Sequence, residues 1–368
     1  MTRRGNNLLP AHALPGRGLW VLAAALVLSV GAGAATGQPA GAPEGKDEFG
    51  EFRRVQGVGV LTLWGTPYQR GLAHGRLVSQ GVLDMVDRLC GSNLLIRREG
   101  DYDRVVLPLM ARFHFEPDDE DELRGILDGV KERLGDKAVL RRLKRPLSIP
   151  DLKAYNTAGD WRRHACSSFA AWGTLTKDGH TWVGRNFDYL PAPEYYPNQM
   201  IVVQRAAAGK EAWAGVGVPG LIGCITGLNA KGVFLATHDV HLPVGKPVEG
   251  YAPRLLVLRR LMESCSPGAL EAQASPILKQ RPRMFDSSVL LAGPVQAGSP
   301  PAMVFECAAV AKGADGVTVR RCGGDQDAIS REAITCTNWY RARPGAPANP
   351  ADLRYELIRK VLLARATT

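Results

Sequence analysis

The chain has 368 residues, of which 45% are hydrophobic and 22% are charged, and its formal net charge is +10. The hydrophobic fraction is that of a globular protein, which excludes a disordered, a collagen-like or a coiled-coil chain. The basic residues form no long stripe interleaved with aromatic residues, and this argues against a nucleic-acid partner.

The first 34 residues are organised as a secretory signal peptide. Arginines precede an uncharged, mostly apolar run at residues 19–30, and the small residues Ala32-Gly33-Ala34 follow it. This run is shorter than the ~20 residues that a bilayer-spanning helix needs. We therefore predict cleavage near Ala35, export to the periplasm or the extracellular space, and no stable membrane span afterwards. An uncleaved membrane anchor is the alternative.

The seven cysteines are an odd number for an exported chain. At least one thiol must therefore stay free or pair between molecules. No two of the cysteines form a CxxC motif, so the sequence predicts no structural zinc site.

Residues 35–165 are expected to be mainly helical after one strand at 55–63. Apolar residues recur at helical spacing over 68–89 and again over 121–143, which predicts two helices with one buried face each. The basic run at 141–145 is interpreted as the solvated end of the second helix.

The pattern changes at Cys166, where strand-like runs begin. The runs at 167–175 and 181–189 bracket Lys177-Asp178-Gly179 and predict a hairpin. A helical first part followed by a β-rich remainder favours a layered α+β fold. Further strands are expected at 200–204, 212–218, 223–227, 232–237, 288–291 and 302–306, helices at 253–262 and 351–364, and Gly- and Pro-rich loops at 292–301 and 343–350.

The hairpin brings three reactive side-chain types together. A turn around Lys177 places Cys166 opposite Asp188 within about one residue, and Arg185 lies three residues before Asp188. A thiol, a guanidinium and a carboxylate then share one end of a sheet. This arrangement fits a nucleophilic site, and it fits equally a buried cysteine beside a structural ion pair.

A nucleophilic thiol needs activation, because its free pKa is about 8.5. The Cys-Gly-x-Cys-Trp signature of papain-type enzymes is absent, and the stretch His238-Asp239-Val240-His241 is interpreted as a polar loop rather than a metal site. Cleavage between Ala165 and Cys166 would instead free an α-amine with a pKa of about 7.7–8.0, which could take the thiol proton.

Five sequence motifs, in chain order, resemble one enzyme family. Residues 166–189 (CSSFAAWGTLTKDGHTWVGRNFDY) resemble the start of the mature chain in cysteine N-terminal-nucleophile (Ntn) hydrolases, which include bile-salt hydrolases, penicillin V acylases and acid ceramidases. Residues 65–75 (GTPYQRGLAHG) resemble the pro-region opening of the isopenicillin-N acyltransferase-like family, the acyl-coenzyme A:aminopenicillanic acid acyltransferases. Residues 227–233 (GLNAKGV), 335–338 (TCTN) and 352–355 (DLRY) resemble three later motifs of that family, the last with Asp352 in place of a serine.

The resemblance implies a fold and a reaction. The fold would be a four-layer αββα sandwich of the Ntn type, with residues 35–165 as a helical pro-region or small chain and 166–368 as the catalytic chain. Autocatalytic cleavage between Ala165 and Cys166 would separate the two. The enzyme would cleave a linear amide through a thioester on Cys166, then release the acyl group to water or to an amine, without a metal or organic cofactor.

The resemblance also implies a role for individual residues. Cys166 would be the nucleophile, and Arg185 and Asp188 would hold its amine and thiol. Asn338 would donate to the oxyanion through its side-chain amide, a contact worth ~3–4 kcal/mol of barrier. Arg354 would brace this cluster, although it also fits a helix-surface arginine.

Asp239 departs from the family pattern. It stands about where bile-salt hydrolases carry an asparagine near the oxyanion, so a backbone N–H is expected to be the second donor. The substrate would be a small-molecule or peptide amide, and 190–198 and 242–251 are candidate pocket-lining loops. A peptidase for short peptides or amino-acid amides and a non-catalytic exported binding protein, both on the same fold, are the alternatives.

Overall fold

The computed structural model describes residues 43–91, 96, 98–160, 165–188, 195–240, 242, 248–309, 316–323, 330–345 and 352–366. The predicted signal peptide, His241 and parts of both candidate pocket-lining loops lie outside the described residues. None of the described helices combines the length and the apolar character that a bilayer crossing requires.

The described chain begins with a three-stranded meander of β1 (Gly45–Asp47), β2 (Gly50–Val55) and β3 (Val58–Leu63). Gln56 and Gly57 both have positive φ, +52° and +84°, which is the backbone of a tight two-residue hairpin turn. The single strand expected at 55–63 is therefore wrong at its start, because this turn separates β2 from β3.

Helices follow the meander; one predicted helix is interrupted, and another ends earlier than expected. The helix expected over 68–89 is two helices, α1 (Pro67–Leu77) and α2 (Ser79–Leu89), because the backbone of Val78 leaves the helical region at φ −130° and ψ 33°. The second predicted helix is α4 (Pro117–Leu134), which ends at Gly135 with φ +53°. Short α3 (Leu107–Met110) precedes it and α5 (Ile149–Asn156) follows it.

The basic run at 141–145 does not end a helix, contrary to our interpretation. It forms the turn between β4 (Val139–Leu140) and β5 (Arg145–Pro146). There the backbone N–H of Arg142 donates to the Asp87 carboxylate at 2.9 Å. The side chains of Arg141 and Arg142 pair with Asp84 and Asp87 of α2 at 3.5 and 3.6 Å, so these charges face α2.

Helices α1 and α4 cross at glycines that belong to the 65–75 motif. A Cβ atom built on Gly71 would lie 2.1 Å from the carbonyl oxygen of Glu122, and one on Gly75 would lie 2.3 Å from that of Ile126. Neither position leaves room for a side chain. His74, in the same motif, accepts the backbone N–H of Gly220 at its Nε2 atom, 2.9 Å away. The motif therefore has a packing role in this chain.

The larger sheet has the strand order β1-β2-β3-β8-β9-β10-β11-β12-β13-β14. All neighbours are antiparallel except β3 and β8, which are parallel. The expected strand at 223–227 is shifted to β10, and β14 was not predicted. The strands of this sheet that follow the helices are β8 (Met200–Gln204), β9 (Trp213–Gly217), β10 (Thr226–Asn229), β11 (Phe234–Asp239), β12 (Ser287–Ala292), β13 (Ala302–Cys307) and β14 (Val317–Arg321).

A second sheet carries Cys166. It has the order β15 (Ala333–Cys336), β6 (Ala165–Gly173) and β7 (Gly179–Asp188). The predicted hairpin is confirmed. Cys166 pairs with Phe187, and Ala165 pairs with Asp188, so the expected register is right within one residue.

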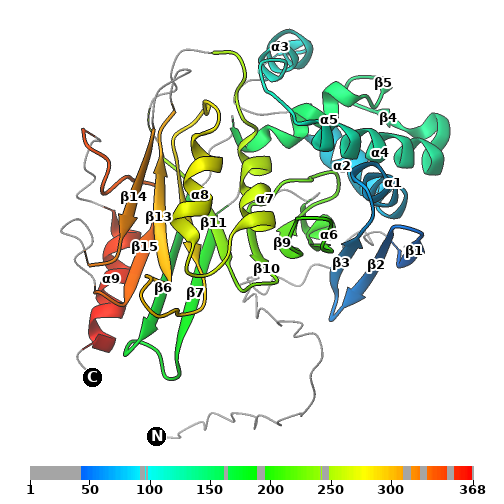
Figure 1. Cartoon of the computed structure of the whole chain (residues 1–368). Coiled ribbons are helices and arrows are strands. Elements are labelled where there is room, and N and C mark those ends of the chain that lie inside the picture. The colour runs from blue at the N-terminus through cyan, green and yellow to red at the C-terminus, as the bar shows by residue number, and fades with distance from the viewer. Residues whose placement is uncertain are drawn as a thin grey trace, which may run out of the picture. The chain divides into compact units, whose positions relative to one another are not determined.

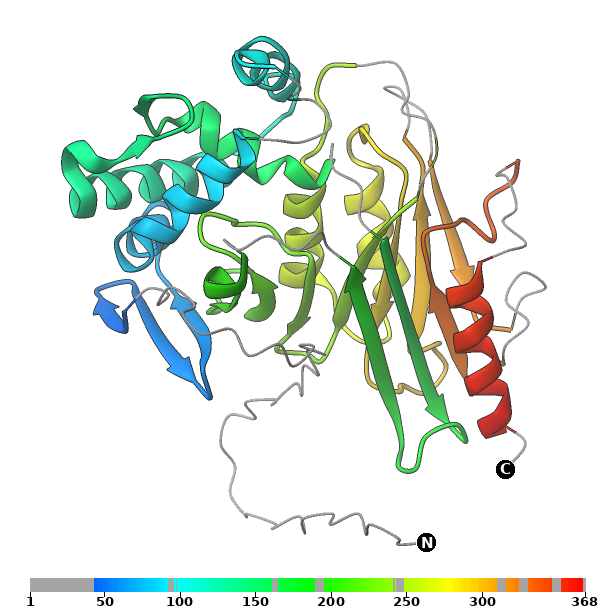
Figure 2. The same ribbon diagram turned by 180° about the vertical axis from the view of Figure 1, so that it is seen from behind.

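The two sheets pack face to face, with helices on their outer faces. Helices α7 (Arg254–Ser264) and α8 (Leu270–Lys279) contact the larger sheet and lie in front of it in Figure 1. Helix α9 (Leu353–Ala366) contacts β15 and β6 and is seen beside them in Figure 2. The structure is thus mixed α and β, as predicted. The apolar layer between the sheets consists of Ala170, Trp172, Ile334, Cys336, Leu290, Ala292, Ala302 and Val304.

Residues 43–160 contain strands as well as helices, because β1, β2 and β3 belong to the larger sheet.

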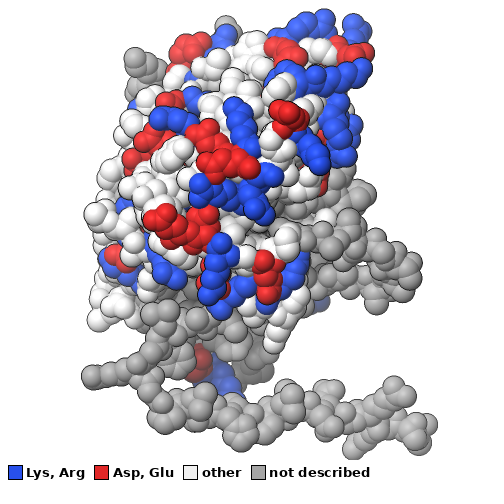
Figure 3. Space-filling view, turned by 90° about the vertical axis from the view of Figure 1, so that its right-hand side faces the viewer, with Lys and Arg blue, Asp and Glu red and all other residues white. Residues whose placement is uncertain are grey.

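On the face shown in Figure 3, basic and acidic side chains lie next to one another, and no large patch of one sign forms there.

Candidate active site

The Cys166 thiol lies at the start of β6 beside a guanidinium from β7. Ser168 pairs with Arg185 in the sheet register, so Arg185 shares the face on which Cys166 and Ser168 project. The Nη2 atom of Arg185 donates to Cys166 Sγ at 3.4 Å, and its Nη1 atom donates to the Thr237 carbonyl at 2.8 Å. The thiol is 1% exposed. The thiol and the guanidinium expected at this sheet end therefore contact each other. Asp188 is one residue further along β7 than Phe187, the partner of Cys166, so its carboxylate projects from the other face of the sheet.

Burial sets the protonation state of this thiol in the uncleaved chain. It raises the pKa of Cys166 to about 11, against the lowering effect of the Arg185 charge. The sulfur is therefore a neutral thiol at neutral pH. The guanidinium limits the cost of forming a thiolate but does not overcome desolvation.

Asn338, directly after β15, holds the backbone of Cys166. Its Oδ1 atom accepts the Cys166 N–H at 2.8 Å and an N–H of Arg354 at 2.7 Å. Its Nδ2 atom donates to the carbonyl of Asp239 at 2.5 Å. The amide is thus fixed between strand β6, strand β11 and helix α9.

Arg354 joins Asn338 to Asp188. The Nη1 atom of Arg354 lies 3.4 Å from Asp188 Oδ2, and Asn186 donates to Asp188 Oδ1 at 2.6 Å. Arg354 therefore points toward the cluster, not only to solvent. Because Asp188 pairs with Ala165 across the hairpin, its carboxylate belongs to the strand position opposite the predicted scissile bond.

Asp352, which stands where the family pattern has a serine, begins α9. Its Oδ1 atom accepts the backbone N–H of Tyr355 at 3.2 Å, and its Oδ2 atom accepts the Thr337 hydroxyl at 2.5 Å. Aspartate and serine are both good N-cap residues. The substitution therefore preserves the helix start that positions Arg354.

Asp239 is not available as an oxyanion donor. Its carboxylate pairs with the Nη1 atom of Arg254 at 2.6 Å, and its carbonyl accepts from Asn338. Asp239 thus accepts hydrogen bonds through both its carboxylate and its carbonyl, and a backbone N–H as second oxyanion donor stays a prediction.

Two residues near this cluster, Arg254 and Asp160, were missed by the sequence analysis. Arg254, the first residue of α7, donates its backbone N–H to Asp160 Oδ2 at 3.0 Å, and its Nη2 atom donates to the Gly159 carbonyl. Burial raises the pKa of the Asp160 carboxyl to about 7, although Arg254 opposes this shift. A lone arginine before the apolar run 255–258 was the available signal.

His238 is not in a polar loop, contrary to our interpretation. Strand β11 continues through His238 and Asp239, which pair with Ser288 and Ser287. The His238 Nε2 atom lies 2.8 Å from the Ser168 hydroxyl, and burial together with the Arg185 charge keeps its pKa well below the usual value. In the part of the chain that the structure describes, no group of three or more His, Cys, Asp or Glu side chains is placed to hold a metal ion.

Cys166 differs from the other buried cysteines in its surroundings. Burial raises the pKa of Cys224 and Cys265 to about 12 and that of Cys307 to about 11. The Cys166 sulfur accepts a hydrogen bond from the Arg185 guanidinium. The buried free thiols are Cys90, Cys166, Cys224, Cys265, Cys307 and Cys336.

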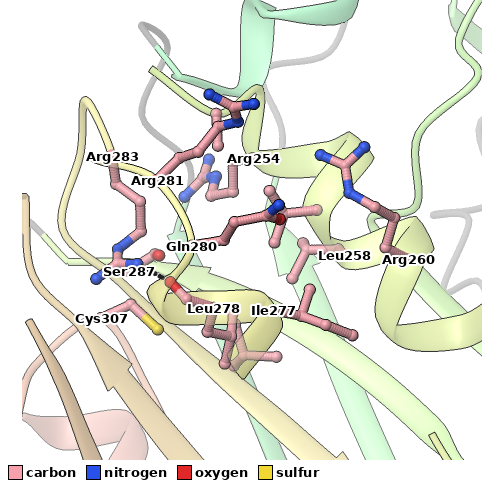
Figure 4. Close-up of a pocket in the computed structure, with 13 residues that line it drawn as sticks. Arg254, Leu258, Arg260, Ile277, Leu278, Gln280, Arg281, Arg283, Ser287 and Cys307 are labelled. Atoms are coloured by element: carbon pink, nitrogen blue, oxygen red, sulfur yellow. Dashed lines mark hydrogen bonds between the residues drawn. The ribbon is translucent and has the colours of Figure 1, made fainter. Parts of the chain in front are cut away.

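A basic pocket lies between α7, α8 and the ends of β12 and β13 (Figure 4). Its four arginines are already engaged. Arg254 pairs with Asp239, Arg260 with Asp119 at 3.1 Å and Arg281 with Glu116 at 3.4 Å, while Arg283 donates to the carbonyls of Leu278 and Ala308. The ion pairs of Arg260 and Arg281 thus connect the start of α4 to α7 and to the segment after α8.

Of the comparisons with known proteins, a match to a family model bears on the motifs. No curated protein matches the chain. One similar solved structure is a "Caenorhabditis elegans N-acylethanolamine-hydrolyzing acid amidase (NAAA) ortholog", which is 16% identical, with a TM-score of 0.34 over 48% of this chain and 70% of that chain. Residues 174–341 match the family described as "Acyl-coenzyme A:6-aminopenicillanic acid acyl-transferase". This range includes Arg185, Asp188, Asp239 and Asn338, whereas Cys166 and Arg354 lie outside it. The family match confirms the resemblance inferred from the motifs.

Proposed function

We propose that this chain is an exported, self-processing cysteine amidohydrolase or acyltransferase that cleaves a linear amide through a thioester on Cys166. The family match supports an Ntn-type amidase or acyltransferase with a small-molecule substrate. The role of Cys166 as the nucleophile rests on two contacts of this residue, with Arg185 at its sulfur and Asn338 at its nitrogen.

Maturation would begin at the Ala165–Cys166 peptide. The Cys166 sulfur attacks the Ala165 carbonyl, the C–N bond breaks as the C–S bond forms, and the thiol proton passes to the departing nitrogen. Water then hydrolyses this thioester and leaves a free thiol, a free α-amine and a new carboxylate at Ala165. Asn338 Oδ1 already accepts the N–H of Cys166 and would hold the resulting amine.

Turnover would use the same groups. The α-amine of Cys166 takes the thiol proton, and the thiolate attacks the substrate amide beside the positive charge of Arg185. The Nδ2 atom of Asn338, oriented by its bond to the Asp239 carbonyl, is proposed to donate to the oxyanion. The amine product departs with the proton, and water or an acceptor amine releases the acyl group from Cys166.

The arrangement of layers supports the αββα sandwich that the resemblance implies. In this proposal α7 and α8 form one helical layer, the two sheets form the middle layers, and α9 belongs to the other helical layer. Residues 35–165 would be the small chain and 166–368 the catalytic chain. Residues 1–34 would be removed on export.

The proposal is tested by the intact mass and the N-terminal sequence of the secreted protein. We expect two chains, 35–165 and 166–368, with Cys166 as the new N-terminus, and a single uncut chain from Cys166→Ala. The matched control is Cys336→Ala, a buried thiol on the neighbouring strand β15, which should be cut normally.

A panel of small amides and short peptides then tests the activity. Alkylation of Cys166 should abolish amide cleavage by the matured protein. An uncut wild-type chain that cleaves none of these substrates would favour the exported binding protein, and cleavage confined to short peptides would favour the peptidase.

A further inference from the structure

We propose that Arg254 is a positioning residue for the reaction at Cys166, because it holds both the strand end that orients Asn338 and the chain segment that leads to the scissile bond. This inference rests on the proposed function. No hydrogen bond between Arg254 and the reacting sulfur is among those of the described structure, although its charge lowers the pKa of that thiol. Arg254→Lys keeps this charge, so the variant tests the directed bonds to the partners of Arg254.

The first observation is the set of partners that Arg254 brings together. Its side chain is buried, with 5% exposed, and its Nη1 atom lies 2.6 Å from Asp239 Oδ1. The Nη2 atom donates to the carbonyl of Gly159, and the backbone N–H donates to Asp160 Oδ2 at 3.0 Å. One residue therefore joins α7, the end of β11 and the segment shortly before Ala165.

The second observation is how short the path is from Arg254 to Cys166. Asp239 receives the guanidinium on its side chain and the Asn338 amide on its carbonyl. Asn338 in turn accepts the backbone N–H of Cys166. If Asp239 lost its partner, only strand pairing with Ser287 would hold the carbonyl that orients the Asn338 amide. A small shift of that carbonyl would move the amide, and with it the contact to the nitrogen that becomes the proposed base.

The third observation is that this position demands an arginine. The Asp239 carboxylate is buried against the Arg254 guanidinium, and a buried charge is tolerated only when it is paired and hydrogen-bonded. The planar fork of arginine reaches Asp239 and Gly159 at once, whereas the ammonium of lysine is a point charge on a flexible stem. Lysine would keep the charge but not both directed bonds.

The experiment compares full-length Arg254→Lys and Asp239→Asn with the wild type. The rate of conversion to two chains is measured first, followed by kcat and KM of the matured protein on its best amide. Because small displacements of positioning groups can cost up to ~10²-fold in rate, we expect each variant to slow cleavage and kcat by about 10-fold or more while KM changes little. The double variant should be no slower than the slower single variant, since both act on one path.

The matched control is Arg259→Lys on the same helix. Arg259 is equally buried, with 3% exposed, and it pairs with Glu122 and Glu263, away from Asn338. We expect it to lower the unfolding temperature while the folded protein is cut at the wild-type rate. Equal slowing by Arg259→Lys, or wild-type cleavage and kcat in Arg254→Lys, would overturn the inference.

The outcomes also separate this inference from the proposed function. Failure of the wild-type chain to cut itself would contradict the proposed function, whereas a normal Arg254→Lys variant of a self-cutting chain would contradict only the positioning role. Should Arg254→Lys fail to fold, Asp239→Asn decides alone. It keeps the backbone carbonyl and side-chain volume, so unchanged cleavage and kcat in that variant would overturn the inference.

Discussion

At the residue scale, Arg185 is the charged group that most lowers the pKa of the buried Cys166 thiol. Burial still raises that pKa to about 11 with the Arg185 charge in place. Arg185→Gln removes the charge and keeps hydrogen-bond donors, so the thiol pKa should rise further. We expect the alkylation rate of Cys166 in the uncut chain at pH 8 to fall by about 10-fold or more, with its pH profile shifted upward.

Iodoacetamide labelling of that site, followed by mass spectrometry across a pH series, measures this change. The matched control is Arg343→Gln, which removes another arginine that donates to a backbone carbonyl, that of Gly316. A Cys166 alkylation profile that is the same in Arg185→Gln and in the wild type would contradict the role given to this guanidinium.

Asp160 makes a second prediction at this scale, on stability. Its folded pKa of about 7 lies above the ~3.9 of an unfolded aspartate. The folded state therefore holds a proton that the unfolded state has lost, and stability falls as pH rises from about 4 to about 7. Asp160→Asn removes this dependence, so its stability relative to the wild type should improve with pH by up to about 1.4 kcal/mol per unit in this window.

Urea unfolding of both proteins at pH 4, 5, 6 and 7 gives this difference directly. Other ionisable groups are the same in the two proteins, so their contributions cancel. A difference that stays constant from pH 4 to 7 would show that Asp160 ionises in the folded chain as it does in the unfolded one.

The candidate site could be predicted in part from the sequence. Cys166, Arg185 and Asp188 lie on one hairpin, where strand pairing fixes their distances from local spacing alone. Arg254 and Asp160 could not be found in this way, because their contact joins residues that are far apart in the sequence and the spacing of neither segment encodes it. The role of Asp239 as a double acceptor was hidden for the same reason.

At the element scale, the crossing of α1 and α4 depends on small residues. A Cβ atom on Gly71 would lie 2.1 Å from the Glu122 carbonyl oxygen, so Gly71→Ala must push the two helices apart. Overpacking of this kind typically costs about 1–3 kcal/mol. We expect the free energy of unfolding to fall by that amount, measured by chemical denaturation of Gly71→Ala.

Gly45→Ala is the matched control for this substitution. An added Cβ there would meet Leu77 at 3.5 Å, which is an ordinary van der Waals contact. We expect its stability to stay within about 0.5 kcal/mol of the wild type. Similar losses in the two variants would show that the helix crossing tolerates a methyl group.

Periodicity predicted where most elements lie but not where they end. It located α1 and α2 as one apolar stripe, because a break at Val78 leaves the spacing of apolar residues almost unchanged. The apolar spacing predicted that α4 continues beyond Gly135, although a glycine with positive φ ends a helix readily. It missed α8, whose sequence has Pro276 in its interior. Helix ends and breaks depend on local backbone conformation, which the spacing of apolar side chains predicts only weakly.

At the scale of the whole molecule, cleavage between Ala165 and Cys166 would cut the chain without removing the contacts between its two parts. Strand β3 pairs with β8 along its length. Buried Glu122 on α4 accepts from Arg259 on α7 and from Gln204 on β8, and His74 accepts from Gly220. Backbone pairing and buried ion pairs of this kind do not depend on the covalent link.

We therefore expect chains 35–165 and 166–368 to elute together in gel filtration under native conditions and to separate in denaturant. Glu122→Gln should weaken this association, because it leaves the Arg70 and Arg259 guanidinium groups buried without their shared carboxylate, a change that typically costs about 3–5 kcal/mol. Asp128→Asn, a half-buried position on the same helix whose carboxylate accepts from Tyr68 within residues 35–165, should leave the association unchanged. If the two chains of the matured wild type eluted separately, the shared sheet would have to come apart after cleavage, and residues 35–165 would be a pro-region that is released rather than a small chain that is retained.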